Sequence, residues 1–126
     1  MINVHFYCSL HGGNFDPTPF LDQAQFEFLD YYRVGDVLQR GRFKGEMSTY
    51  GYICLKSKQK GFDEFVHDLY GIKPLIVKSV ADRKVLHITL EYKGQCNWEF
   101  KPRLLQMISK LGLTLTLSCY ELEDKQ

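Results

Sequence analysis

The same strand-to-helix junction occurs twice in this chain, and this repeat constrains the fold more than any other feature. An alternating run, VHFYCSL, precedes NFDPTPFL, and a second run, VLHITLEY, precedes EFKPRLL. In both copies a Phe is followed two residues later by a Pro, and an apolar residue stands three positions after the Pro. The aligned pairs are Phe15 with Phe100, Pro17 with Pro102, and Phe20 with Leu105.

Each copy predicts a helix that begins where a strand ends. Asp16 before a proline is a typical helix start, because Asp caps free N–H groups and Pro fits the first helical position. Phe15 and Phe20 occupy the two positions of a hydrophobic staple, which fixes the angle at which a chain enters a helix. The first helix is expected to end near Phe26 or Phe28. In the second copy Lys101 is a weaker cap.

The rest of the second half continues this pattern. The run LGLTLTLSCY predicts a helix end at Gly112 and then a closing strand, because apolar and polar residues alternate along it. The expected apolar stripe of the preceding helix is Leu104, Leu105, Ile108 and Leu111. The strand residues expected to face the core are Leu113, Leu115, Leu117 and Cys119.

Between the two junctions the sequence predicts two strands, at 30–39 and 48–57, joined by a long hairpin connection at 39–49. A helix at 62–71 and a short helix after Pro74 follow. The fold class is therefore α+β, with the order β-α-β-β-α-(α)-β-α-β and a ferredoxin-like or split β-α-β plan. Helices would cover one face of a mostly antiparallel sheet. The helix residues expected to face the core are Phe62, Phe65, Val66, Leu69, Leu75, Ile76 and Val80.

Length, charge and cysteine spacing narrow the class of protein. The 126 residues predict one domain at 1–121 with an acidic tail at 122–126. A net charge of +1 gives no electrostatic reason for a nucleic-acid partner. Apolar runs fall short of the roughly 18 residues that span a bilayer, and the N-terminal run lacks signal-peptide features. A cytoplasmic protein with free thiols is expected, with Cys8, Cys54 and Cys119 buried.

The sequence contains no familiar catalytic or metal-binding motif, so we predict no catalytic residue, no metal ligand and no cofactor. Two weaker hypotheses stay open. His5 and His87 lie on comparable strands and could face each other as an acid–base pair. The HGGN turn at 11–14 could bind an anion through backbone N–H groups, or could simply be a tight turn.

Tyrosine and arginine gather at 31–52, and these are the residue types that anchor protein interfaces. Trp98 follows the loop KGQCN and is expected at the same end of the molecule as the HGGN turn. The acidic tail would suit a basic partner. The predicted binding residues are Tyr32, Arg33, Asp36, Arg42, Phe43, Tyr50 and Trp98.

Several segments together resemble the family named domain of unknown function 4279. They are NFDPTPFL, the turn YRVGD, the strand YGYICL, the helix start EFKPRLL and the closing LGLTLTLSCY. The resemblance covers nearly the whole chain and implies a compact α+β bacterial protein with no established activity. The family often has an acidic residue just before the final Tyr, where this chain has Cys119, so any role of that position is in doubt here.

Small proteins of this type resemble partners in toxin–immunity systems. The expected function is therefore non-enzymatic: an immunity protein that binds a bacterial toxin domain and occludes it. This is an analogy at the level of protein class. The alternative is a small-ligand or regulatory module with its site near the glycine turn at 11–14.

Overall fold

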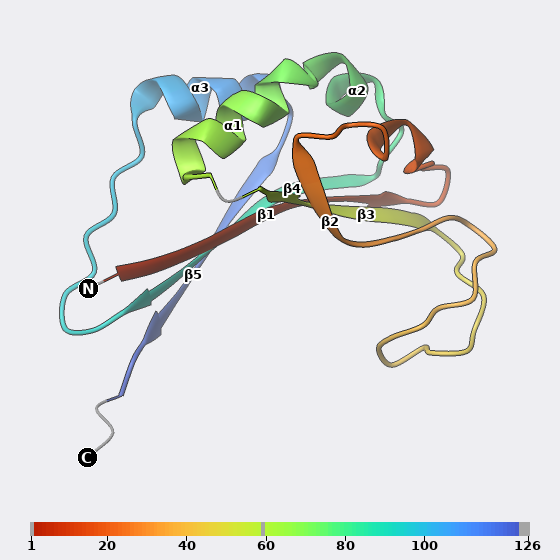
Figure 1. Ribbon diagram of the computed structural model, residues 1–126, viewed down its shortest axis with the longest axis horizontal. Coiled ribbons are helices and arrows are strands. Elements are labelled where there is room, and N and C mark those ends of the chain that lie inside the picture. Colours follow the sequence, from red (N-terminus) through yellow and green to blue (C-terminus); the bar gives the residue numbers. More distant parts are fainter. Residues whose placement is uncertain (1, 59, 124–126) are drawn as a thin grey trace.

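The computed structural model describes residues 2–58 and 60–123, which form a five-stranded mixed sheet with helices on one face (Figure 1). The strand order is β2-β3-β1-β4-β5. The pairs β2–β3, β3–β1 and β1–β4 are antiparallel, and β4–β5 is parallel. The strands are β1 (Ile2–Gly12), β2 (Phe26–Tyr32), β3 (Gly51–Ser57), β4 (Arg83–Tyr92) and β5 (Thr114–Glu121). The helices are α1 (Phe62–Gly71), α2 (Lys73–Lys78) and α3 (Pro102–Lys110), with a 3-10 turn η1 (Thr18–Phe20).

The connections explain this strand order. β3 and β4 both pair antiparallel with β1, so they run parallel to each other with β1 between them. The chain crosses from β3 to β4 through α1 and α2, which is a split β-α-β arrangement. From β4 it crosses through α3 to β5. The α+β class and a sheet with helices on one face are confirmed, whereas the ferredoxin-like strand order is not.

The first junction does not produce the predicted helix. Only the 3-10 turn η1 forms, and β2 already begins at Phe26, where the helix was expected to end. The turn begins one residue later than the predicted helix, because Pro17 rather than Asp16 occupies the cap position. The Asp16 carboxylate still accepts hydrogen bonds from the Thr18 backbone N–H at 3.0 Å and from the Thr18 hydroxyl at 2.7 Å. Phe15 and Phe20 also pack together, with ring centroids 5.7 Å apart.

The second junction produces the α-helix α3, and Phe100 before it packs on Phe62 of α1 at 6.2 Å. Gly112 after the helix has a φ of +71°, the left-handed conformation expected at a helix end. One stripe residue was assigned wrongly. Leu105 is exposed, and Met107 takes its place among the buried residues because it lies on the same side of the helix as Leu104 and Ile108.

The core lies between the sheet and the helices. Alternate residues of β1, including Phe6, Cys8 and Leu10, point toward the helices, as the alternation in the sequence predicted. The ring of Phe65 on α1 lies 5.3 Å from Phe6 and 6.0 Å from Phe26. The predicted core residues of α1 are all buried: Phe62, Phe65, Val66 and Leu69. On the next segment Ile76 is buried, but Val80 is 61% exposed and was wrongly predicted as core.

The closing strand β5 is less covered than predicted. Leu113 is buried and Leu115 packs against the core, but Leu117 is 48% exposed and Cys119 is exposed as well. The cause is geometric, because β5 continues away from the helical layer (Figure 1). Cys8 and Cys54 are buried free thiols as expected; Cys119 is also a free thiol, but it is exposed, so its predicted burial was wrong. The residues 124–126 of the predicted tail lie outside the described residues.

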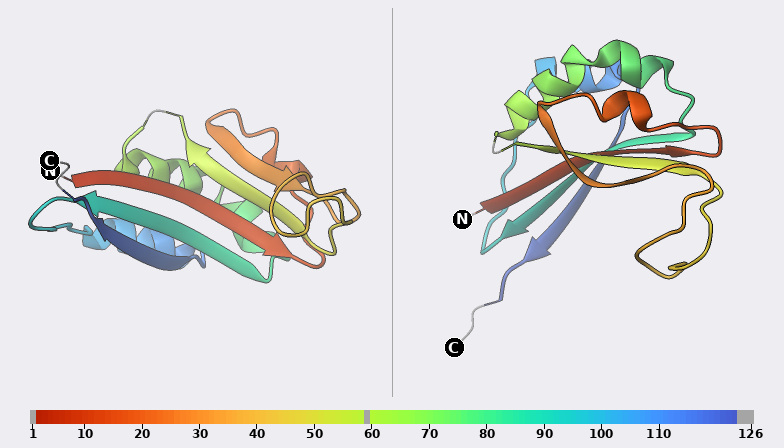
Figure 2. Two further views of the ribbon diagram at one scale, coloured as in Figure 1. Left: turned by 90° about the horizontal axis from the view of Figure 1, so that it is seen from below. Right: turned by 45° about the vertical axis from the view of Figure 1, so that its right-hand side comes forward.

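The predicted strand at 30–39 is displaced toward the N-terminus, because β2 ends at Tyr32. The connection between β2 and β3 therefore spans residues 33–50 rather than 39–49, and we call it the arm. It extends from the end of the sheet on the side opposite the helices (Figures 1 and 2). We call the sheet surface on this side, away from the helices, the open face. None of the described helices is long and apolar enough to cross a membrane.

Candidate functional site

The arm is an ordered hairpin rather than a loose loop. The Gly35 N–H donates to the Ser48 carbonyl at 2.8 Å, and the Ser48 N–H donates to the Asp36 carbonyl at 2.7 Å. One rung further out, the Leu38 N–H donates to the Glu46 carbonyl at 2.9 Å. This short ladder presents the tip, residues 39–45, at a fixed place in front of the open face.

Arg33 and Asp36 hold the base of the arm. The Asp36 carboxylate accepts a hydrogen bond from the Arg33 backbone N–H at 2.7 Å, and the Arg33 guanidinium donates to the Thr18 hydroxyl at 2.9 Å. The Asp16 carboxylate lies 3.9 Å from the same guanidinium. Hydrogen bonds from Thr18, with a smaller contribution from Arg33, hold the pKa of Asp16 below its ordinary value. Arg33 and Asp36, both predicted to bind a partner, therefore make contacts within the chain: Arg33 fastens the arm to η1, and Asp36 closes the turn at the base of the arm.

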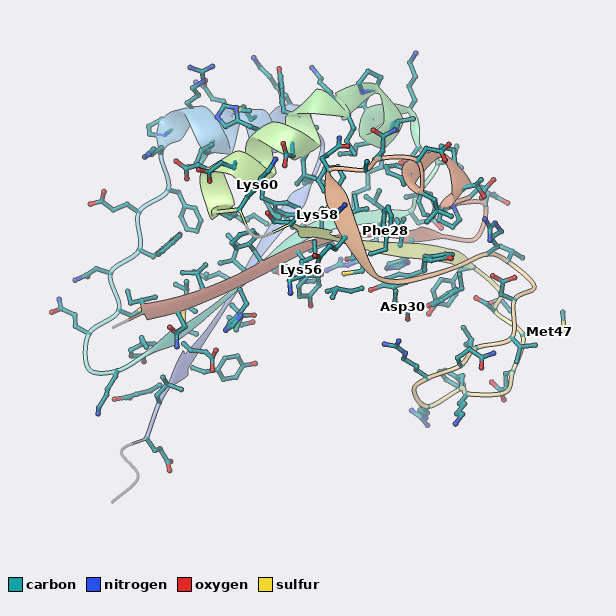
Figure 3. All side chains as sticks on the ribbon, in the orientation of Figure 1. Phe28, Asp30, Met47, Lys56, Lys58 and Lys60 are labelled. Carbon is teal, nitrogen blue, oxygen red and sulfur yellow. The ribbon has the colours of Figure 1, made fainter. Side chains whose placement is uncertain are left out.

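Further out, the arm exposes large apolar side chains. Phe43 at the tip is 56% exposed and Met47 is 68% exposed, and Figure 3 shows Met47 pointing outward from the arm. The guanidinium of Arg42 lies 5.7 Å from the centre of the Phe43 ring, in a cation–π contact. The exposed apolar residues of the arm are Val34, Val37, Phe43, Met47 and Tyr50.

A hollow of about 310 Å³ separates the tip from the sheet. Three tyrosines form its inner wall: the Tyr32 hydroxyl donates to the Tyr50 hydroxyl at 2.9 Å, and the Tyr32 ring stacks on Tyr52 at 5.2 Å. Burial, then the hydrogen bond to Tyr50, raises the pKa of Tyr32, so this phenol stays neutral. The residues that line the hollow are Asp30, Tyr32, Leu38, Arg40, Gly41, Arg42, Phe43, Tyr50 and Tyr52.

The structure thus brings four of the predicted binding residues together at the hollow. They are Tyr32, Arg42, Phe43 and Tyr50. Asp30 lies just outside the region 31–52 that the sequence indicated, and Tyr52 lies within it but was not among the predicted binding residues; both reach the same hollow because β2 and β3 pair side by side. In Figure 3 Asp30 lies on the side of the sheet that carries the arm. The alternation of β2 and β3 could have found both residues, because Tyr32 and Tyr52 are direct cross-strand partners.

Trp98 does not join this site. It lies in the connection between β4 and α3, at the other end of the sheet from the arm (Figure 1). Its ring packs against the core, and its indole N–H is buried without a hydrogen-bond partner among the described residues. The expectation that Trp98 accompanies the HGGN turn is therefore wrong, because β1 carries that turn to the opposite end of the sheet.

A polar row crosses the open face beside the hollow. The Ser9 hydroxyl lies 3.1 Å from His87 Nε2, and the Thr116 hydroxyl lies 2.8 Å from His87 Nδ1. The ring of Tyr7 stacks on the His87 ring at 4.6 Å. Burial, and to a smaller extent the charge of Arg83, lowers the pKa of His87, so its ring is neutral at pH 7. Three strands that are far apart in sequence are joined here through side chains.

Ser9 and His87 are the residue types of a nucleophile–base pair, but in this row their hydrogen bonds hold neighbouring strands together. Ser9 lies in the middle of a strand and is only 6% exposed, so little of it is open to solvent. The hypothesis that His5 faces His87 is also wrong. The strand register places Tyr7 opposite His87 and Thr89 opposite His5. The His5 side chain instead pairs with Glu91.

The HGGN turn is used within the chain. A side chain at Gly12 would lie 2.7 Å from the Asp82 backbone nitrogen, so only glycine fits there. The Gly13 N–H donates to the Asp82 carboxylate at 3.1 Å, so this backbone group is not available to an anion.

Next to the turn, η1 and α2 enclose an apolar recess of about 440 Å³. Among the described residues, no three His, Cys, Asp or Glu side chains gather as a metal site.

Comparison with known proteins adds no relative to this picture, so the resemblance to the family of domain of unknown function 4279 stays a prediction. No family model matches the chain, and no curated protein or solved structure matches it either.

Proposed function

We propose that this chain is a non-enzymatic binding protein whose arm enters an apolar cleft on a protein partner. The observation that carries the proposal is the arm itself, an ordered hairpin that exposes Phe43 and Met47 to solvent. Large apolar side chains exposed together on an ordered projection are typical of an interaction site. Because the arm is ordered before binding, little conformational entropy is lost on association.

The positive charge of the tip indicates that the rim of the partner's cleft is acidic. Residues 39–45, QRGRFKG, carry three cations and no carboxylate. A partner with acidic groups around an apolar cleft would complement this tip, and the charges would favour both the rate and the specificity of association. Arg42 is of a residue type that often dominates interface energies, and Phe43 is of a type enriched in the cores of interfaces. The partner is thus not a strongly basic nuclease.

Within this class the most specific proposal is an immunity protein that neutralises a bacterial toxin in the cytoplasm by occlusion. It rests on the family resemblance and on the analogy of protein class. The arm supports occlusion as the mechanism, because a projecting hairpin can fill a cleft and exclude a substrate sterically. The burial of Ser9 supports a role without catalysis.

The test is quantitative capture of partners from the native host, with the tagged chain as bait and mass spectrometry as readout. The wild type is compared with a double variant of the tip, Arg42→Ala with Phe43→Ala. The matched control is Val80→Ala, which removes an exposed apolar side chain on the helical side of the molecule. We expect one stoichiometric partner that the wild type and the control retain and the tip variant loses at least tenfold.

A second step separates the immunity proposal from binding in general. The partner is expressed in a heterologous host, where a toxin would arrest growth. Co-expression of the wild type should restore growth, and co-expression of the tip variant should not. Equal retention of the partner by the tip variant would refute the role of the arm. A partner that leaves growth unaffected would refute the immunity function while leaving the binding function intact.

The alternative function, a small-ligand module near the turn at 11–14, is favoured by the recess between η1 and α2. Phe20, Pro74 and Leu75 make its floor apolar, and Asp16 and Lys78 add charges at the rim. This composition would suit a small apolar acid. A thermal-shift screen of such acids tests it: the melting temperature of the wild type should rise, and that of Leu75→Arg should not. No shift with the wild type would exclude this alternative.

A further inference from the structure

Among the described residues, no strand pairs with the outer edge of β5. β5 forms its ladder with β4, at the last position of the sheet order, and all of its residues from Leu117 to Glu121 are exposed. Figure 2 shows β5 at the margin of the sheet. An edge strand of this kind presents a row of unpaired backbone N–H and C=O groups, which is a template for pairing with another strand.

The two edges of the sheet differ in how they are protected. β2 at the opposite edge has a bulge between Phe28 and Asp30 and carries Glu27 and Asp30, both of which discourage edge pairing. β5 reads TLTLSCYE and contains no proline and no basic residue. Its pairing with β4 continues without a break, and its one charge, Glu121, stands at the end. The chain therefore blocks one edge and leaves the other available.

The open edge also exposes apolar side chains on both faces. Leu117, on the helix side, is 48% exposed, and Tyr120, on the open face, is 59% exposed. Leucine and tyrosine side chains of a strand lose water most effectively when a neighbouring strand covers them. The unpaired backbone and these two side chains lie on the same eight residues.

We propose that β5 pairs antiparallel with β5 of a second copy of this chain, about a two-fold axis at Leu117. Leu117 then lies opposite its own copy on the helix side. Residues related by such an axis share one face of a continuous sheet, so the helices of both copies cover the same side. The other opposed pairs are Thr116 with Ser118, Leu115 with Cys119, and Thr114 with Tyr120.

Charge and closure favour a second copy as the occupant. The two Glu121 side chains are eight residues apart along the paired strands, about 27 Å at 3.4 Å per residue, so they do not repel each other appreciably. The axis uses both open edges at once and leaves the protected β2 edges outside. Assembly therefore stops at a dimer instead of continuing into a fibre.

This dimer is independent of the proposed function, because β5 and the arm belong to opposite edges of the sheet. The two arms would project from the outer ends of the continuous sheet. Loss of the dimer would leave each arm intact, and loss of the arm would leave the dimer intact.

The test measures the molar mass of the full chain by light scattering across a concentration series. We expect twice the chain mass of 14.8 kDa for the wild type. Leu117→Lys and Leu117→Glu should each give the single-chain mass, because each places like charges directly opposite one another. An equimolar mixture of the two variants should recover the double mass, since Lys then faces Glu. Val80→Lys, at a site on the helical side that is 61% exposed, should stay dimeric.

The mixing step keeps the test decisive even if a variant is less stable than the wild type. Recovery in the mixture requires that position 117 faces itself, which no general destabilisation would produce. A wild-type mass of 14.8 kDa throughout the series would overturn the proposal. A double mass for Leu117→Lys alone, or no recovery in the mixture, would overturn it as well.

Discussion

Replacing Phe65 by alanine should remove much of the stability of this protein. Phe65 is fully buried beneath α1, with ring contacts to Phe6 at 5.3 Å and Phe26 at 6.0 Å. Truncation of a buried Phe to Ala costs about 3–5 kcal/mol, because apolar burial is lost and a cavity is left. The two aromatic contacts place Phe65→Ala in the upper part of that range. A domain of this size has about 5–15 kcal/mol in total.

Urea unfolding at constant temperature measures this loss. With a dependence of about 2 kcal/mol per molar urea, a cost of 4 kcal/mol lowers the unfolding midpoint by about 2 M. The matched control is Phe43→Ala, the same chemical change at the exposed tip of the arm, which should stay within about 0.5 kcal/mol of the wild type. A midpoint shift below about 0.5 M for Phe65→Ala, or an equal shift for Phe43→Ala, would refute the assignment of core and surface.

Two further predictions concern pH and backbone packing. The lowered pKa of His87 means that the unfolded chain takes up a proton more readily than the folded one, so the stability contributed by the neutral ring is present above about pH 6.5 and is lost as the pH falls below it. His87→Gln should therefore lose less free energy of unfolding than the wild type between about pH 8 and pH 5 in urea titrations. An equal loss in both proteins would contradict the role of His87. A side chain at Gly51 would lie 1.9 Å from the Phe15 carbonyl oxygen, whereas one at Gly13 would meet nothing within 4 Å; Gly51→Ala should therefore cost about 1–3 kcal/mol and lower the melting temperature, with Gly13→Ala near neutral, and similar melting temperatures would contradict this packing.

Local sequence patterns predict those strands and helices that bury only one face. In β1 the core-facing residues alternate, and in α1 Phe62, Phe65 and Leu69 recur at helical spacing, so both elements could be predicted from the sequence. The first predicted helix was wrong, and the 3-10 turn found in its place begins one residue later than the expected helix start. Phe15 packs on Phe20 as expected, but β2 already begins at Phe26, where it pairs with β3, and only one short turn forms before it.

The sequence predicted which residue types form the candidate site, but it did not predict which of them meet in space. The region of the arm stood out because it is rich in Tyr and Arg. Its inner wall depends on the pairing of Tyr32 with Tyr52, which is set by the strand register. The row through His87 joins strands that are distant in sequence, so no local pattern reveals it. Trp98 was misplaced for the same reason, since the position of a loop depends on the whole topology.

The most direct measurement of the central claim is a hydrogen–deuterium exchange footprint of this protein, alone and in complex with its captured partner. If the arm is the binding element, amides within residues 33–50 should gain the largest protection on binding, while those of α1 and α3 should change little. Protection concentrated on the helices, with exchange in residues 33–50 unchanged, would contradict the account.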